Sequence, residues 1–125
     1  MASLDRGGSF RDLALGEFID ELASSTPVPG GGSASAVAAS LGAALVAMVA
    51  SLSAGRPKYA EHAALHERSL EVGRRLATRF LDLADEDATA YGRFADAMKL
   101  PKDSDAEREL RRAALSVAAR GAAEV

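Results

Sequence analysis

Residues 34–54, ASAVAASLGAALVAMVASLSA, decide the fold of this chain because they form one uninterrupted apolar segment. No Asp, Glu, Lys or Arg occurs between Glu21 and Arg56. A segment of this length can form a membrane-spanning helix, yet much of it is Ala, Ser and Gly, which insert weakly into lipid. We therefore predict a helix that lies inside a soluble helical bundle and is buried on all of its sides. A membrane-anchored helical hairpin is the alternative.

The segments around this run predict helices separated by turns. A helical pattern starts at Leu13 and ends before Pro27, because the residue before a proline is pushed out of the α-helical region. Residues 26–33, TPVPGGGS, then form the clearest loop, in which Ser33 is a suitable N-cap for the apolar helix. A long helix is expected over residues 58–98, since apolar side chains recur there at steps of three, four or seven.

The sequence after Pro101 predicts one more helix. Residues 104–107, SDAE, have the spacing of a capping box, and no Gly or Pro stop signal closes the helix that they open. No segment has a credible strand pattern, so the chain is predicted to be all-α. We expect a flexible N-terminal segment at residues 1–12 and a helical domain at residues 13–125. The missing stop signal has two interpretations: either the C-terminal helices of the domain are missing here, so that this is its N-terminal portion, or a partner chain completes the last helix.

The composition excludes several classes of protein. A length of 125 residues suits one domain, and a net charge of −3 without a basic run argues against nucleic acid as a partner. The chain has no Cys, which excludes disulfides, zinc ribbons, iron–sulfur clusters and cysteine nucleophiles. Only 5% of the residues are aromatic, so the core must consist largely of Ala, Leu and Val.

Asp87 is the most informative single residue, because it interrupts the apolar stripe of the long helix between Leu83 and Tyr91. Burial of an unpaired carboxylate costs several kcal/mol, so Asp87 is expected to be paired, hydrogen-bonded, protonated or exposed to a pocket. Two interpretations remain open. Asp87 either takes part in function or is a structural carboxylate held by a helix N-terminus or by an Arg of a neighbouring helix.

The glycine loop is the second candidate site. Gly30, Gly31, Gly32 and Ser33 precede a helix, where free backbone N–H groups and the positive end of the helix dipole suit an anionic or carbonyl group. The loop lacks the Lys of a Walker motif, and no strand precedes it. A tight turn between two packed helices is the equally good structural interpretation.

Three further observations concern charged and imidazole side chains. His62 and His66 have a spacing that can chelate a metal, but no third ligand is evident, so no metal site is predicted. Glu21 lies six residues before Pro27 and can reach the region of the glycine loop. Lys102 is a cation in a constrained turn. A surface charge is the simpler interpretation of both Glu21 and Lys102.

Several of these segments together resemble the cyclodeaminase/cyclohydrolase family, which includes the C-terminal half of formiminotransferase-cyclodeaminase. The resemblance rests on ordered motifs and extends from about residue 15 to residue 125. The motifs are FIDELAS at 18–24, PVPGGGS at 27–33, LGAALVAMV at 41–49, DEDATAY at 85–91 and AMKLPK at 97–102.

The resemblance implies an all-helical, cytoplasmic, homodimeric enzyme of one-carbon folate metabolism. Such an enzyme either closes 5-formiminotetrahydrofolate to the 5,10-methenyl form with release of ammonia, or opens the methenyl ring with water. The tetrahydrofolate derivative is the carrier substrate and the small-molecule partner; no metal, nucleic acid or membrane is implied. Members of the family usually continue for several more helices.

The same resemblance implies roles for residues at the motif positions. We expect Asp87 to act as general acid/base, with Glu21 orienting it or sharing the role. The loop residues Gly30, Gly31, Gly32 and Ser33 would hold a polar edge of the folate together with Tyr91, and Lys102 would meet a carboxylate of its glutamate tail. The competing hypothesis is a non-catalytic helical module that binds folate or only dimerises.

Overall fold

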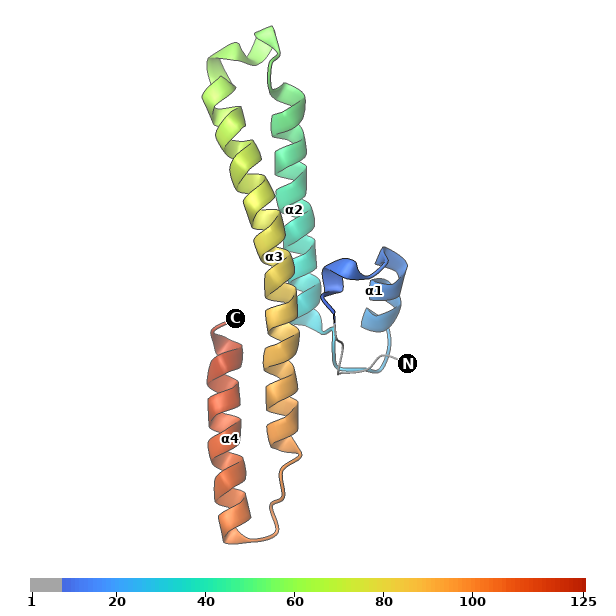
Figure 1. Cartoon of the computed structure of the whole chain (residues 1–125), viewed down its shortest axis with the longest axis vertical. Coiled ribbons are helices and arrows are strands. Elements are labelled where there is room, and N and C mark those ends of the chain that lie inside the picture. Colours follow the sequence, from blue (N-terminus) through green and yellow to red (C-terminus); the bar gives the residue numbers. More distant parts are fainter. Residues whose placement is uncertain (1–7) are drawn as a thin grey trace. The chain divides into compact units, whose positions relative to one another are not determined.

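The computed structural model describes residues 8–125 as helices joined by turns, without a β-strand in that range (Figure 1). The predicted all-α fold is confirmed. Contacts divide the chain into two compact units: residues up to Ala34 together with Leu83–Val125, and Ser35–Asp82. The helices in chain order are α1 (Leu15–Leu22), α2 (Gly31–Ser53), α3 (Ala63–Met98) and α4 (Asp105–Ala123), with 3-10 turns η1 (Phe10–Asp12) and η2 (Pro57–His62).

Within the unit Ser35–Asp82, α2 and α3 form an antiparallel helical hairpin that packs through small residues. The Ser40 hydroxyl donates a hydrogen bond of 2.7 Å to the Ala77 carbonyl oxygen. A Cβ atom added at Gly73 would lie 2.9 Å from the Ala43 carbonyl oxygen, so the two backbones approach more closely than a larger side chain allows. Small residues therefore set the distance between these helices, as the Ala-rich composition predicts.

The burial of α2 differs from the prediction. Its small residues Ala43, Ala47 and Ala50 are buried, but Leu41 and Leu45 remain 63% and 57% exposed. The expected burial on all sides is therefore wrong within residues 8–125, because α3 covers only one stripe of α2 in its unit. By length and composition alone α2 could also cross a membrane.

In the other unit, η1 is packed against α1. Phe10 of η1 is buried and contacts Phe18 of α1 edge to face, with ring centroids 5.5 Å apart. Part of the segment predicted to be flexible, residues 1–12, thus has a defined structure in Ser9–Asp12. Residues 1–7 lie outside the described residues, and the predicted domain boundary stays a prediction.

Helix ends follow the local sequence with two exceptions. Ser104 caps α4 as predicted, since its hydroxyl oxygen accepts a hydrogen bond of 3.1 Å from the Glu107 amide. However, α2 already begins at Gly31, so Ser33 lies inside the helix and is not its N-cap. The long helix begins at Ala63 instead of residue 58, because the chain kinks at Tyr59 within η2.

Candidate functional site

One turn of α3, Ala84–Asp87, organises the region around the glycine loop. Ser33 is fully buried in the first turns of α2, and its hydroxyl donates a hydrogen bond of 2.8 Å to the Ala84 carbonyl oxygen. Ala84 is fully buried as well. This bond joins residues 51 positions apart and fixes the start of α2 against α3.

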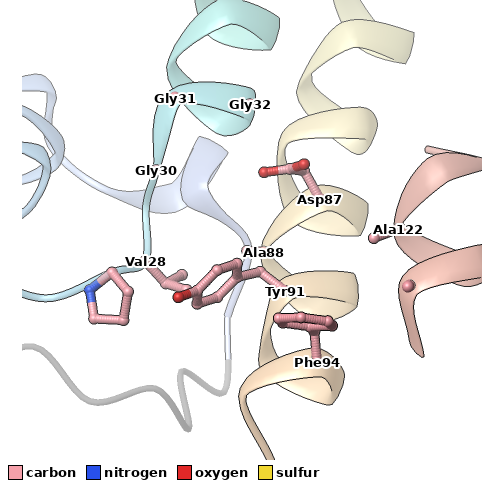
Figure 2. A pocket seen from close by; sticks show the side chains of 11 residues that line it. Val28, Gly30, Gly31, Gly32, Asp87, Ala88, Tyr91, Phe94 and Ala122 are labelled. Carbon is pink, nitrogen blue, oxygen red and sulfur yellow. The ribbon is translucent and has the colours of Figure 1, made fainter. Parts of the chain in front are cut away.

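Asp87 lies directly against the first turn of α2. A Cβ atom added at Gly32 would lie 2.5 Å from Cγ and from both carboxylate oxygens of Asp87, a distance that real Cβ atoms essentially never show. Figure 2 shows the Asp87 carboxylate directed from α3 toward Gly31 and Gly32. A side chain at position 32 would therefore force the Asp87 carboxylate or the start of α2 to move.

The carboxylate of Asp87 is placed where it can serve a ligand. The first turn of a helix has N–H groups without intrahelical partners, and the helix dipole favours negative charge there. This position agrees with the structural interpretation of a carboxylate at a helix N-terminus. Yet Asp87 forms no hydrogen bond or ion pair with other residues in the range 8–125, and it is only half-buried. Its oxygens are therefore available to a ligand as well.

A pocket of about 570 Å³ opens beside Asp87. In Figure 2 the ring of Tyr91 lies toward Val28, while Phe94 lies one turn further along α3. Apolar and aromatic walls with a few polar groups are typical of sites for small organic molecules. The lining residues are Pro27, Val28, Gly30, Gly31, Gly32, Asp87, Ala88, Tyr91, Phe94, Ala119 and Ala122.

The structure brings together most of the residues predicted from sequence. Gly30, Gly31, Gly32, Asp87 and Tyr91 line one pocket. Tyr91 is 42% exposed and lines that pocket, so part of it is accessible to a ligand. The glycine loop and the long helix, two motifs more than 50 positions apart in the sequence, thus form one candidate site.

The remaining predicted residues lie outside the lining. Ser33 is buried behind the loop and stabilises α2, as described above. Glu21 is half-buried in the last turn of α1, with its Oε2 atom inaccessible to solvent. Lys102 is exposed in the turn between α3 and α4, where its carbonyl oxygen accepts a hydrogen bond from Arg108. Their predicted roles stay predictions.

Several lining residues carry no chemical signal in the sequence. Phe94 belongs to the apolar stripe of α3, and nothing in the sequence distinguishes it from the other apolar residues of that stripe. Ala119 and Ala122 come from α4, and their small side chains line the pocket. Only packing of α4 against α3 reveals these small side chains as part of the wall.

The two histidines lie elsewhere, near the start of α3. The rings of His62 and His66 are 6.4 Å apart at their centroids, and His62 pairs with Glu61 at 3.3 Å. Among residues 8–125, no three His, Asp or Glu side chains form a group that could hold a metal ion. The expected absence of a metal stays a prediction.

Comparison with known proteins agrees with these motifs. The sequence profile described as formiminotransferase-cyclodeaminase matches residues 14–125. A methenyltetrahydrofolate cyclohydrolase from Methylorubrum extorquens is 39% identical over 108 residues, which cover 86% of this chain and 52% of that protein. The formimidoyltransferase-cyclodeaminase of Mus musculus is 34% identical over 117 residues, which cover 94% of this chain and 22% of that protein.

The chain therefore spans about half the length, or less, of the curated relatives that it matches. The profile nevertheless covers nearly all of its residues, including the glycine loop, the turn of α3 that carries Asp87, and α4. On this evidence the chain belongs to the formiminotransferase-cyclodeaminase family.

Proposed function

We propose that this chain binds a tetrahydrofolate derivative and takes part in closing or opening its 5,10-methenyl ring. The names of two relatives, methenyltetrahydrofolate cyclohydrolase and formimidoyltransferase-cyclodeaminase, support this class of reaction. The observation that carries the proposal is the Asp87 carboxylate, which lies against Gly32 in a pocket shared with Tyr91. This arrangement combines an acceptor for protons with an aromatic surface for a flat heterocycle.

Both directions of the reaction require proton transfer at nitrogen. In hydrolysis, the oxygen of water bonds to the methenyl carbon and the bond from this carbon to one nitrogen breaks. One proton of the water goes to that nitrogen and the other to solvent. In deamination, the second folate nitrogen attacks the formimino carbon and ammonia leaves. The leaving nitrogen gains the proton of the attacking nitrogen and one further proton.

Asp87 is the group that we propose for these proton transfers. A positioned carboxylate commonly contributes roughly 10²–10⁴-fold to such a step. Glu21 would orient Asp87 or share the role, although it does not line the pocket. The loop residues and Tyr91 would hold the pteridine edge, and Lys102 would meet a carboxylate of the glutamate tail.

The substitution Asp87→Asn tests the proposed role because it keeps the size of the side chain and removes its basic oxygen. With 5,10-methenyltetrahydrofolate as substrate, we expect kcat to fall by roughly 10²–10⁴-fold while the dissociation constant changes little. Turnover within a few-fold of the parent would exclude Asp87 as the acid/base group. The exposed Glu71→Ala on α3 is the matched control and is expected to leave both constants unchanged.

The direction of the reaction is distinguished by the substrate that is turned over. Release of ammonia from 5-formiminotetrahydrofolate would identify a cyclodeaminase, and loss of the methenyl form in water without ammonia would identify a cyclohydrolase. Saturable binding of either folate without turnover would favour the second candidate, a non-catalytic folate-binding or dimerisation module.

The exposed face of α2 supports this second candidate as well as a homodimeric enzyme. Leu41, Leu45, Val49 and Leu52 are 57–63% exposed on a helix without a charged residue. A second copy of this chain can cover such a face without burying charge, which is expensive without a partner. We therefore propose that two copies associate through α2 in the cytoplasm.

Sedimentation equilibrium tests the proposed association. We expect a dimer for the parent and a monomer for Leu45→Glu. The control Leu110→Glu, which changes an even more exposed leucine on α4 (70% against 57%), should remain a dimer. A parent that sediments as a monomer would contradict a second copy on α2. A parent that pellets with membranes after cell lysis would contradict the cytoplasmic location.

A further inference from the structure

Asp85, two positions before Asp87, ties the N-terminal segment to α3. The backbone N–H of Phe10 donates a hydrogen bond of 2.9 Å to Oδ1 of Asp85. The hydroxyl of Ser9 donates a second hydrogen bond of 2.5 Å to Oδ2 of the same carboxylate. The two bonds occupy both oxygens of Asp85 and join residues 75 and 76 positions apart.

The segment held in this way is well packed. Ser9 also caps η1, since its hydroxyl oxygen accepts a hydrogen bond of 3.3 Å from the Arg11 amide. Phe10 and Phe18 are each only 6% exposed, and their rings meet at an interplanar angle of 78°. Asp85 therefore fixes η1 directly and α1 through the contact between the two aromatic rings.

The anchored segment leads directly into one wall of the candidate site. The chain leaves α1 at Ala23 and reaches Pro27 and Val28, both of which line the pocket. At the far end of this loop, the bond between Ser33 and the Ala84 carbonyl oxygen fixes α2. The loop thus lies between α1, which Asp85 holds indirectly through η1 and the Phe10–Phe18 contact, and α2, which is bonded to Ala84.

We propose that Asp85 is a positioning residue of the pocket. Its carboxylate holds η1 and α1 in place, and thereby keeps the wall formed by Pro27 and Val28 opposite Tyr91. Asp85 does not line the pocket and so acts only through the segment that it binds. The inference deepens the proposed function, since the ligand that the wall would contact is the tetrahydrofolate derivative.

Hydrogen bonds to a charged group are stronger than those between neutral groups. Removal of the Asp85 carboxylate should therefore loosen the pocket wall enough to weaken ligand binding measurably. With 5,10-methenyltetrahydrofolate as the probe, Asp85→Ala should raise the dissociation constant and KM roughly tenfold, with kcat within about threefold of the parent. Asp85→Asn retains an oxygen that can accept from Phe10 and should recover part of the affinity. Ser9→Ala, which removes one donor, should give an intermediate loss.

Two measurements without a ligand separate this inference from the proposed function. Asp85→Ala should increase hydrogen–deuterium exchange at the Phe10 amide and shift the methyl resonances of Val28, whose environment includes the Tyr91 ring. Glu71→Ala is the control and should change neither. If the parent does not bind the folate, the proposed function fails while the Val28 shift still tests the position of the wall.

Two outcomes would overturn the inference. Unchanged exchange at Phe10 in Asp85→Ala would show that the anchor does not hold the segment. Increased exchange together with an unchanged Val28 resonance would show that the anchor stabilises η1 without positioning the pocket wall. Circular dichroism of each variant checks that the helices are retained, and Asp85→Asn provides the conservative variant if Asp85→Ala fails to fold.

Discussion

Replacing Gly32 by Ala tests the close contact on which the candidate site depends. The added methyl group would lie 2.5 Å from Cγ, Oδ1 and Oδ2 of Asp87, so the carboxylate or the start of α2 must move. Gly31→Ala is the matched control, because no atom lies within 4 Å of the corresponding Cβ position. Both glycines belong to the first turn of α2.

The expected magnitude follows from two opposing effects. Ala is favoured over Gly inside a helix by up to about 1 kcal/mol, and this gain applies equally to Gly31 and Gly32. Inserting a methyl group into occupied space typically costs about 1–3 kcal/mol. We therefore expect Gly31→Ala to be neutral or stabilising. Gly32→Ala should be less stable than Gly31→Ala by about 1 kcal/mol, the lower end of this range, because the half-buried Asp87 side chain can turn away from the added methyl group.

Equilibrium urea unfolding followed by far-ultraviolet circular dichroism measures this difference. A double-mutant cycle identifies its cause: in an Asp87→Ala background the carboxylate is absent, so Gly32→Ala should no longer be less stable than Gly31→Ala. Binding of 5,10-methenyltetrahydrofolate should weaken in Gly32→Ala and persist in Gly31→Ala. Equal stability of the two single variants would refute the contact between Asp87 and Gly32.

Two further predictions concern packing and capping. Gly73→Ala should lower the free energy of unfolding by about 1–3 kcal/mol, since its Cβ would meet the Ala43 carbonyl oxygen at 2.9 Å. Gly92→Ala on the same helix is the control, because no atom lies within 4 Å of the Cβ position at Gly92, and it should be neutral or stabilising by up to about 1 kcal/mol. Equal thermal midpoints for the two variants would contradict the close packing at Gly73. Ser104→Ala should cost about 0.5–2 kcal/mol, because the Glu107 amide loses its acceptor, whereas unchanged urea unfolding would show that the cap contributes nothing.

The sequence predicted much of the candidate site through the type and position of single residues. Asp87 stood out because a carboxylate interrupts an apolar stripe, and the glycine loop because three glycines precede a helix. The family resemblance suggested that Asp87 and the glycine loop serve the same ligand, and in the structure both line one pocket. The anchor at Asp85 was not predicted, because an Asp on a helix beside other acidic residues has no distinctive local pattern.

The sequence by itself determined the all-α class, the end of the long helix at Met98 and the cap of α4, because periodicity, prolines and caps act over a few residues. Only the tertiary structure decided that Ser33 lies inside α2 and bonds to Ala84, and that Ala119 and Ala122 line the pocket. It also decided which stripe of α2 is buried. These features depend on contacts between residues far apart in the chain, and small Ala, Gly and Ser side chains give no sign in the sequence of the partners against which they will pack.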